Sequence, residues 1–232
     1  MAIIAVLPAR AGSKRIKNKN IINFYGKPII YYALQSAMES ELFDKIHVST
    51  ESEKIKDLVT SFGLEVDFLR PKKLADDYTG TISVLKWVLK KYQTLGQNFD
   101  VIFNILPASP LLKPSDLMDA FSLFSKFKKK NPLHVVSKFP VPIDWAYTRS
   151  RDGMLKPVKP GAYKKRSQDL KDTYYESGPF SIFNKNHILG EEPVTDEGFI
   201  SYVMPRNRSI DIDELEDLEL AKMLFSAQKK LK

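Results

Sequence analysis

A short basic loop near the start of the chain has the composition of a phosphate-binding loop. It reads Pro-Ala-Arg-Ala-Gly-Ser-Lys-Arg-Ile at residues 8–16 and runs on to Lys-Asn at 19–20. Glycine lets the backbone approach a phosphate closely, and arginine and lysine supply charge-assisted hydrogen bonds. The spacing matches neither a Walker loop nor a dinucleotide fingerprint. We expect this loop to bind a polyphosphate rather than to be a solvated basic turn, with charge from Arg10, Lys14, Arg15 and Lys19.

Two aspartates two residues apart lie close to the C-terminal end of the chain. In an extended segment, Asp211 and Asp213 point to the same face, so their carboxylates converge. Hard oxygen ligands beside a triphosphate suit Mg²⁺. The alternative is that Asp213 caps the last helix, with Glu216 completing a capping box. Both can hold, because one oxygen of Asp213 can cap while the other binds the metal.

A third polar segment lies between these two. Residues 164–170 read Lys-Lys-Arg-Ser-Gln-Asp-Leu, and Tyr174, Tyr175 and Gly178 follow. Arginine pairs bidentately with a carboxylate and aromatic rings face sugar rings, so this composition suits a sugar acid. Taken alone, the segment is more typical of a surface loop.

Alternating strands and helices must position these segments. Apolar runs predict buried strands at 2–7, 45–50, 66–69 and 100–106, and a further strand beginning at 135. Between them, helices are predicted to begin at Pro28 and to span 52–62, 81–95 and 114–130. This alternation predicts an α/β fold with a mostly parallel sheet and helices on both faces. The basic loop then follows the first strand, where such sheets bind ligands.

The alternation breaks in the last third of the chain. A hairpin is predicted at 145–158 around Asp152-Gly153, and a polar loop at 161–177. Strands at 179–183 and 200–204 and a helix at 213–230 complete the chain. Because no low-complexity stretch divides these parts, we expect one domain, residues 1–232, with an inserted arm at about 140–175.

Composition narrows the classes of function. Hydrophobic residues make up 43% and charged residues 28% of the 232 residues, which is ordinary for a globular protein. The absence of cysteine excludes disulfides, thiolate metal sites and cysteine nucleophiles. There is no apolar run of about 18 residues, and no basic residue precedes the first apolar run. We therefore expect a cytoplasmic protein without a membrane partner.

The net charge of +8 indicates an anionic partner. No zinc-finger spacing, RNP-like aromatic motif or repeat indicates nucleic acid. Lysines at helix C-termini complement the helix dipole and are usually solvated. Much of the excess charge is of this kind, at Lys126, Lys128, Lys129, Lys130, Lys229, Lys230 and Lys232. A small polyanion bound by the basic loop accounts for the rest.

Several motifs resemble one enzyme family. Leu-Pro-Ala-Arg-Ala-Gly-Ser-Lys-Arg-Ile at 7–16 is similar to the signature of the CMP-sialic acid synthetases, or acylneuraminate cytidylyltransferases. The resemblance spans nearly the whole chain, through Val-Ser-Thr at 48–50, Phe-Leu-Arg-Pro at 68–71, Leu-Ala-Asp-Asp at 74–77, Ser-Pro at 109–110 and Asp-Ile-Asp at 211–213. Asp-Tyr-Thr-Gly-Thr at 77–81 and Arg-Ser-Gln-Asp-Leu at 166–170 look most like the pseudaminic acid cytidylyltransferases.

The resemblance implies a Rossmann-like nucleotidyltransferase domain, Mg²⁺ as cofactor and a homodimer whose inserted arm reaches the partner's site. It implies that Arg10, Lys14 and Asp211 act in catalysis and that Asp211 and Asp213 hold Mg²⁺. The nucleotide contacts that it implies are Leu7, Ala9, Arg10, Lys14, Asn20, Arg70 and Thr81, and we expect Gly12, Ser13, Lys19 and Thr79 to join them. The sugar-acid contacts that it implies are Arg166 and Gln168, and we expect Leu106, Tyr174 and Tyr175 to join them.

The implied reaction joins CMP from CTP to the anomeric hydroxyl of a nine-carbon 2-keto sugar acid and releases pyrophosphate. Sialic acid members carry Gln-Pro-Thr-Ser-Pro where this chain has Leu-Pro-Ala-Ser-Pro at 106–110, so an apolar group replaces an amide. The Asp of octulosonate enzymes is also absent from this region. Pseudaminic acid is therefore favoured over legionaminate, N-acetylneuraminate and octulosonate. A non-catalytic nucleotide- or RNA-binding module is the remote alternative, against which the aspartate pair argues.

Overall fold

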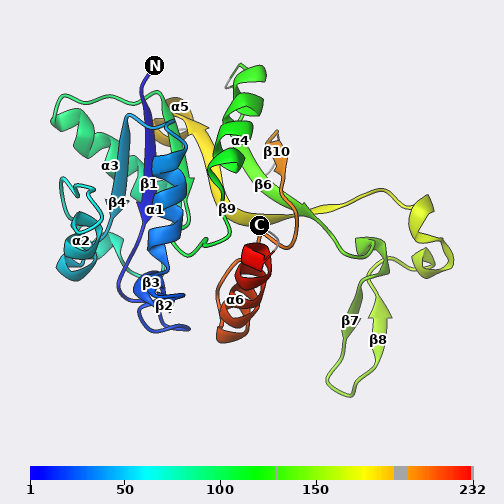
Figure 1. Ribbon diagram of the computed structural model, residues 1–232. Coiled ribbons are helices and arrows are strands. Elements are labelled where there is room, and N and C mark those ends of the chain that lie inside the picture. Colours follow the sequence, from blue (N-terminus) through cyan, green and yellow to red (C-terminus); the bar gives the residue numbers. More distant parts are fainter. Residues whose placement is uncertain (129, 191–197, 231–232) are drawn as a thin grey trace.

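The central feature of the fold is a mostly parallel sheet (Figure 1). The computed structural model describes residues 1–128, 130–190 and 198–230. Within these ranges the sheet has six strands in the order β10-β6-β9-β5-β1-β4. The strands are β1 (Ile3–Pro8), β4 (Lys45–Ser49), β5 (Val101–Ile105), β6 (Leu133–Lys138), β9 (Tyr174–Asn184) and β10 (Ile200–Val203). Only β9 runs against its neighbours, and the predicted mostly parallel sheet is confirmed.

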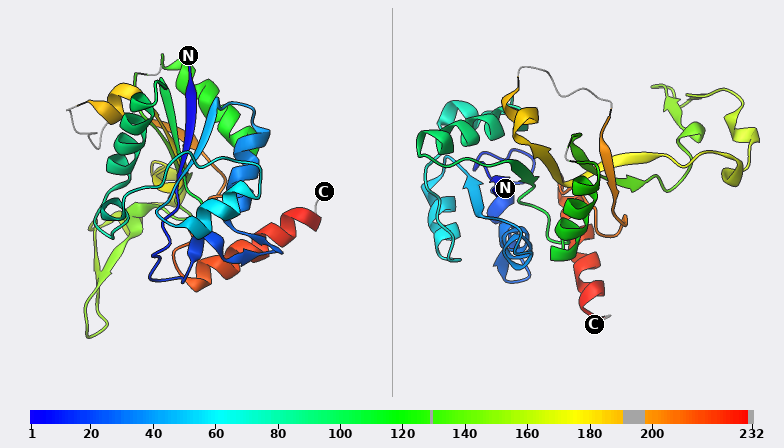
Figure 2. Two further views of the ribbon diagram at one scale, coloured as in Figure 1. Left: turned by 90° about the vertical axis from the view of Figure 1, so that its left-hand side faces the viewer. Right: turned by 90° about the horizontal axis from the view of Figure 1, so that it is seen from above.

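Helices cover both faces of the sheet, as predicted (Figure 2). The helices on the sheet are α1 (Ile30–Glu39), α2 (Glu53–Thr60), α3 (Thr81–Thr94), α4 (Pro114–Lys126) and α5 (Lys185–Leu189), and α6 (Leu215–Lys230) packs beside the basic loop instead. Alternate residues of a strand face opposite sides. Ile3, Ala5 and Leu7 of β1 accordingly pack with α1, α2 and α4, whereas Ile4 and Val6 pack with α3 and α5.

Single 3-10 turns connect several of these elements. They are η1 (Lys19–Ile21), η2 (Lys72–Leu74), η3 (Ile143–Trp145), η4 (Ala162–Lys164) and η5 (Ser167–Asp169). No helix among the described residues is long and apolar enough to cross a membrane.

A third apolar cluster joins the basic loop to the C-terminal helix. Ile16 of the loop is buried with Phe24 of a short hairpin, β2 (Asn23–Phe24) and β3 (Lys27–Pro28). Ile212 and Leu218 of the C-terminal segment complete this cluster. The packing therefore fixes the Asp-Ile-Asp segment beside the loop, although about 200 residues separate them in sequence.

The strand predicted at 66–69 does not form. This segment follows α2 and has no strand pairing in the sheet of the described residues, in which β4 is the edge strand. Its apolar side chains bury against helices and rings instead: the ring of Phe68 lies 4.6 Å from that of His47 and 5.4 Å from that of Trp87, between centroids. The segment has the apolar pattern of a buried strand because its side chains are buried, although its backbone is not hydrogen-bonded into the sheet.

Two helix ends also differ from prediction. Helix α4 ends at Lys126 rather than Lys130, because Lys128 adopts a left-handed conformation with φ 53° that helical residues avoid. Helix α1 begins at Ile30 rather than Pro28, because Pro28 belongs to β3. Lys129, Lys232 and the side chains of Lys229 and Lys230, from the predicted basic segments, lie outside the described residues.

An arm projects from the sheet between β6 and β9 (Figures 1 and 2). The two strands pair at the base of the arm, where Lys138 lies opposite Tyr174, so β9 begins earlier than the predicted residue 179. The arm contains the predicted hairpin, with β7 (Tyr147–Arg149) antiparallel to β8 (Leu155–Pro157). Gly153 has φ 93° in its turn, a conformation that favours glycine.

Candidate active site

A cavity of about 380 Å³ opens at the carboxyl ends of β1 and β5. Pro8 ends β1 and Leu106 directly follows β5, and both line the cavity. The other lining residues are Arg10, Ser13, Lys14, Arg15, Lys19, Asn20, Asp77, Pro107, Ala108, Asp211 and Asp213. The basic loop and the aspartate pair predicted from sequence therefore meet in one cavity.

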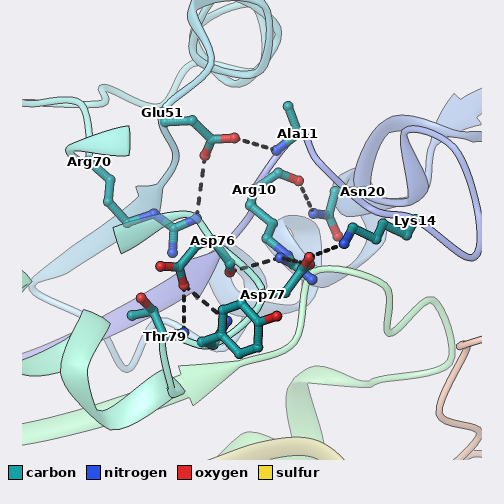
Figure 3. A network of polar contacts seen from close by, with 10 residues as sticks. Arg10, Ala11, Lys14, Asn20, Glu51, Arg70, Asp76, Asp77 and Thr79 are labelled. Carbon is teal, nitrogen blue, oxygen red and sulfur yellow. Dashed lines mark hydrogen bonds and ion pairs between the residues drawn. The ribbon is translucent and has the colours of Figure 1, made fainter. Parts of the chain in front are cut away.

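One carboxylate links the first two cations of the loop (Figure 3). Arg10 Nη1 lies 2.6 Å from Asp77 Oδ1, and Lys14 Nζ contacts Asp77 Oδ2. Arg10 Nη1 also donates to the carbonyl oxygen of Asp76 at 2.8 Å. The hydrogen bonds and charges of Lys14 and Arg10 hold the pKa of Asp77 below its usual value.

A second carboxylate links two further cations of the loop. Arg15 Nη2 lies 2.7 Å from Asp213 Oδ2, and Lys19 Nζ lies 3.1 Å from Asp213 Oδ1. Lys19 Nζ also donates to the carbonyl oxygen of Ile212 at 2.7 Å. Burial opposes the charge on Asp213, but the contacts with Lys19 and Arg15 outweigh it and lower the pKa of Asp213.

Asp211 differs from Asp213 in its electrostatic surroundings. Both side chains line the cavity while Ile212 between them is buried, as the predicted two-residue alternation requires. Asp211 stays accessible to solvent, yet the surrounding protein and the charge of Asp213 raise the pKa of Asp211. An added cation beside the pair would favour the charged form of both carboxylates.

Asp213 does not act as the cap of α6, which begins at Leu215. Asp217 Oδ2 accepts instead from the backbone nitrogens of Glu214 at 2.8 Å and Asp213 at 3.0 Å. The predicted capping box of Asp213 and Glu216 is therefore wrong, because Asp217 takes these backbone donors and the Asp213 carboxylate turns to Lys19 and Arg15.

Two polar residues hold the basic loop in shape. Asn20 Nδ2 donates to the carbonyl oxygen of Arg10 at 2.9 Å. Glu51 Oε1 accepts from the backbone nitrogen of Ala11 at 2.8 Å, and Glu51 Oε2 lies 3.4 Å from Arg70 Nη2 (Figure 3). Sequence reasoning missed Glu51. Its position was a signal, because it lies just beyond the carboxyl end of β4, separated from the strand only by Thr50, and such sheets bind ligands at that edge.

The other predicted nucleotide contacts lie behind or beside the cavity rather than in its lining. Leu7 and Ala9 are fully buried in the core. Arg70 is buried against Glu51, and Thr79 donates its backbone nitrogen to Asp76 Oδ1 at 2.7 Å. Gly12 and Thr81, the first residue of α3, also lie outside the lining.

The predicted sugar-acid contacts fall into two separate places. Leu106 lines the cavity, near Gly178. Gln168 lines a second cavity of about 300 Å³ at the base of the arm, and Arg166 Nε pairs with Asp169 Oδ2 at 3.0 Å. Tyr174 is exposed in β9, and the ring of Tyr175 packs 5.0 Å from that of Phe139. The structure does not bring these four arm residues to the cavity of their own chain.

The segment that leads to Asp211 is anchored by a buried ion pair that sequence reasoning also missed. Arg208 Nη1 contacts Asp116 Oδ2, and Tyr202 donates to Asp116 Oδ1 at 3.1 Å. The next residue, Ser209, makes a second contact, with its Oγ 2.6 Å from Ser137 Oγ. These contacts tie the aspartate pair to α4, β10 and β6.

Comparison with known proteins assigns the family. The sequence model of a family described as cytidylyltransferase matches residues 4–231.

This chain belongs to the cytidylyltransferase family.

Two relatives have similar identity to this cytidylyltransferase and different names. Pseudaminic acid cytidylyltransferase of Campylobacter jejuni subsp. jejuni serotype O:2 is 33% identical, over 97% of each chain. CMP-N,N'-diacetyllegionaminic acid synthase of Legionella pneumophila subsp. pneumophila is 32% identical, also over 97% of each chain. A solved structure of CMP:2-keto-3-deoxy-manno-octonic acid synthetase with CTP matches with TM-score 0.74 and 13% identity, over 98% of this chain and 100% of that one. The last match supports the Rossmann-like nucleotidyltransferase fold.

Proposed function

We propose that this cytidylyltransferase transfers CMP from CTP to the anomeric hydroxyl of a nine-carbon 2-keto sugar acid, with pseudaminic acid as the favoured acceptor. The carrying observation is the single cavity at the end of β1, which joins four cations of the basic loop to two converging aspartates. A binding module for a nucleotide or RNA has use for the cations. It gains nothing from two carboxylates beside phosphate unless a metal binds as well.

Positioning and charge compensation do most of the work in this reaction. The anomeric hydroxyl of the acceptor loses its proton to water as its oxygen forms a bond with the α-phosphorus, while the bond from phosphorus to the bridging oxygen of the β-phosphate breaks, so pyrophosphate leaves with the bonding electrons. Arg10 and Lys14 hold the terminal phosphates and stabilise the charge that builds up on pyrophosphate. The fixed loop, held by Asn20 and Glu51, keeps the reacting groups aligned.

Asp211 and Asp213 fit a magnesium ion. They supply hard oxygen donors in one cavity; burial, and then the charge of Asp213, raise the pKa of Asp211, and a bound cation would offset both effects. No group of three metal-binding side chains occurs among the described residues. Two carboxylates are enough for Mg²⁺, which takes its other ligands from substrate phosphates and water. Bound there, the ion would polarise the phosphoryl oxygens and lower the pKa of the acceptor hydroxyl.

We further propose that the enzyme is a homodimer and that each arm completes the partner's cavity. Arg166 and Gln168 lie on the arm, away from the cavity of their own chain. The arm also exposes large apolar side chains that a second copy would cover: Val141, Ile143, Tyr147, Leu155, Val158 and Tyr163. A two-fold dimer makes such an exchange reciprocal.

The acceptor preference rests on Leu106 and on the segment Arg166 to Leu170. Leu106 lines the cavity beside Gly178, so its apolar side chain is available to a substrate. An acceptor whose amide or hydroxyl faces this side chain loses about 1–3 kcal/mol for each buried unpaired group. The legionaminate reading is the second candidate, because the relative from Legionella pneumophila is 32% identical.

The test measures pyrophosphate release from CTP, in the presence of Mg²⁺, with pseudaminic, legionaminic, N-acetylneuraminic or octulosonic acid as acceptor. We expect pseudaminic acid to exceed N-acetylneuraminic acid in kcat/KM by roughly tenfold or more, the equivalent of about 1.4 kcal/mol. Leu106→Gln should narrow this gap. An equal or reversed preference would reject the pseudaminate assignment, and activity with none of the four acids would reject the sugar-acid assignment.

A further inference from the structure

Four cations of the basic loop pair with carboxylates from outside the loop. Asp77 bridges Arg10 and Lys14, and Asp213 bridges Arg15 and Lys19. The second bridge belongs to the proposed metal site. The first comes from a residue 67 positions along the chain from Arg10 and has no part in the mechanism above.

Asp77 contacts the two cations as a phosphate group would. Each oxygen of its carboxylate contacts a different cation, Oδ1 with Arg10 and Oδ2 with Lys14. The side chain lines the same cavity as both cations, so it occupies space that a bound phosphate needs. A carboxylate and a phosphate make the same charge-assisted contacts with such cations.

A tight turn presents Asp77 to the cavity (Figure 3). Asp76 Oδ1 accepts from the backbone nitrogens of Tyr78 at 3.0 Å and Thr79 at 2.7 Å. The carbonyl oxygen of Asp76 also accepts from Arg10. The turn therefore fixes Asp77 while leaving its carboxylate free to exchange partners.

The bridge is weak enough to be displaced. The side chains of Asp77 and Arg10 are 33% and 35% exposed, and that of Lys14 is 80% exposed. Ion pairs at such positions contribute little and are screened by salt. A triphosphate brings more charge and more oxygens to the same two cations.

We propose that Asp77 is an internal counter-ion of the phosphate-binding loop. It holds Arg10 and Lys14 in the cavity when no nucleotide is bound, gives way to the phosphates of CTP, and returns to the two cations as pyrophosphate leaves. Asp77 is thus a positioning residue that limits the affinity for phosphate groups and favours product release. This inference rests on the proposed function, because it requires Arg10 and Lys14 to bind phosphate.

The experiment titrates inorganic pyrophosphate into the full-length protein by calorimetry, with EDTA present and at low salt. Asp77→Asn keeps the shape of the side chain and removes its charge, so we expect pyrophosphate to bind roughly three- to tenfold more tightly. The gain should shrink as salt is raised. Asp100→Asn is the matched control, because Asp100 faces Lys185 at 3.5 Å at the opposite end of β5. It should leave the affinity unchanged.

Asp77→Asn in an Arg10→Ala/Lys14→Ala background separates the counter-ion proposal from the assignment of the phosphate-binding loop. If the counter-ion proposal holds, Asp77→Asn has no effect once its two cations are gone. Unchanged or weaker pyrophosphate binding by Asp77→Asn in the otherwise native chain overturns the proposal. Unaltered pyrophosphate binding by Arg10→Ala/Lys14→Ala would instead show that the phosphate-loop assignment itself is wrong.

Discussion

At the residue scale, the charge balance of the cavity rests on two shared carboxylates, Asp77 and Asp213. Each holds two cations of the basic loop at contact distance. The cations therefore already point into the cavity before a nucleotide binds, and little reorganisation is needed for phosphate to take over the contacts. This preorganisation is what electrostatic catalysis requires.

Arg10→Ala and Lys14→Ala should each lower kcat/KM for CTP roughly 100-fold, or about 3 kcal/mol, because each removes a preorganised donor to the leaving pyrophosphate. Steady-state pyrophosphate release measures the effect. Lys185→Ala removes a lysine at the opposite end of the sheet and serves as the control with unchanged kinetics. Full kcat/KM in both loop variants would contradict the assignment of the loop.

Residue types revealed the cations and the aspartate pair, but not their partners. A run of arginine, lysine and glycine after a strand has few other uses, so Arg10 and Lys14 were predictable. The role of Asp77 was not, because nothing local marks a carboxylate whose partner lies 67 positions away, and Glu51 was missed although it lies just beyond the carboxyl end of β4. Leu106 was predicted as an acceptor contact from its position at the end of the strand predicted at 100–106, and it lines the cavity.

At the scale of elements, the aspartate pair depends on contacts that bring the end of the chain to α4 and β6. Asp116 is almost fully buried, and its charge is balanced by Arg208. Removing one partner of a buried pair leaves an uncompensated charge and is strongly destabilising. The Arg208–Asp116 pair therefore couples the stability of the fold to the geometry of the proposed metal site.

Arg208→Ala should lower the free energy of unfolding by about 3–5 kcal/mol, which urea denaturation followed by circular dichroism would measure. Arg149→Ala, on the exposed strand β7, should change it by about 0.5 kcal/mol or less. A loss of similar size in both variants would mean that the buried pair has no special role in stability.

A second buried network makes the edge of the sheet sensitive to acid. His47 Nδ1 lies 3.0 Å from the hydroxyl of Tyr92, which donates to Asp67 Oδ2 at 2.6 Å. Burial lowers the pKa of His47 to about 4, with Lys45 and Arg70 adding to the effect and Asp67 opposing it. The folded protein therefore keeps His47 neutral at a pH where the unfolded chain takes up a proton.

As the pH falls from about 6.5 to 4, proton uptake by the unfolded chain should remove about 3 kcal/mol from the free energy of unfolding. Above pH 6.5 both states are neutral at His47 and this contribution is constant. His47→Gln should flatten the slope over this window in urea denaturation at several pH values. An unchanged slope in the variant would assign the acid sensitivity to other groups.

Strands and helices with a clear period were predictable, and elements fixed by tertiary contacts were not. The apolar run of β1 and the helix after Pro114 appear where their patterns indicate. Residues 66–69 have the pattern of a strand, but they bury Phe68 against His47 without joining the sheet. Burial alone cannot tell a strand from an extended segment beside an edge strand.

At the scale of the whole molecule, the arm holds polar residues predicted for the acceptor site away from the cavity of its own chain. Subunit complementation tests whether it serves a partner. Lys14→Ala damages the cavity and Arg166→Ala damages the arm, so we expect each homodimer to have low activity. In a mixed dimer with sites shared between chains, one site carries both defects and the other carries neither.

Refolding an equal mixture of the two variants should therefore restore about a quarter of the native activity, since half the dimers are mixed and each has one native site. Native protein refolded in parallel gives the reference value for full activity. Size-exclusion chromatography should report a dimer throughout. If the activity of the mixture stays at the mean of the two variants, the arm of one chain does not complete the cavity of its partner.

The most direct test of the cytidylyltransferase activity is ³¹P NMR of CTP, Mg²⁺ and the best sugar acid of the panel with the full-length protein. We predict that CTP gives equal amounts of pyrophosphate and a phosphodiester of CMP with the acceptor, and that neither forms without the acceptor. Asp211→Asn, folded as judged by circular dichroism, should lose most of this turnover. Acceptor-independent breakdown of CTP to free CMP, or undiminished turnover by Asp211→Asn, would contradict the proposed reaction and its metal site.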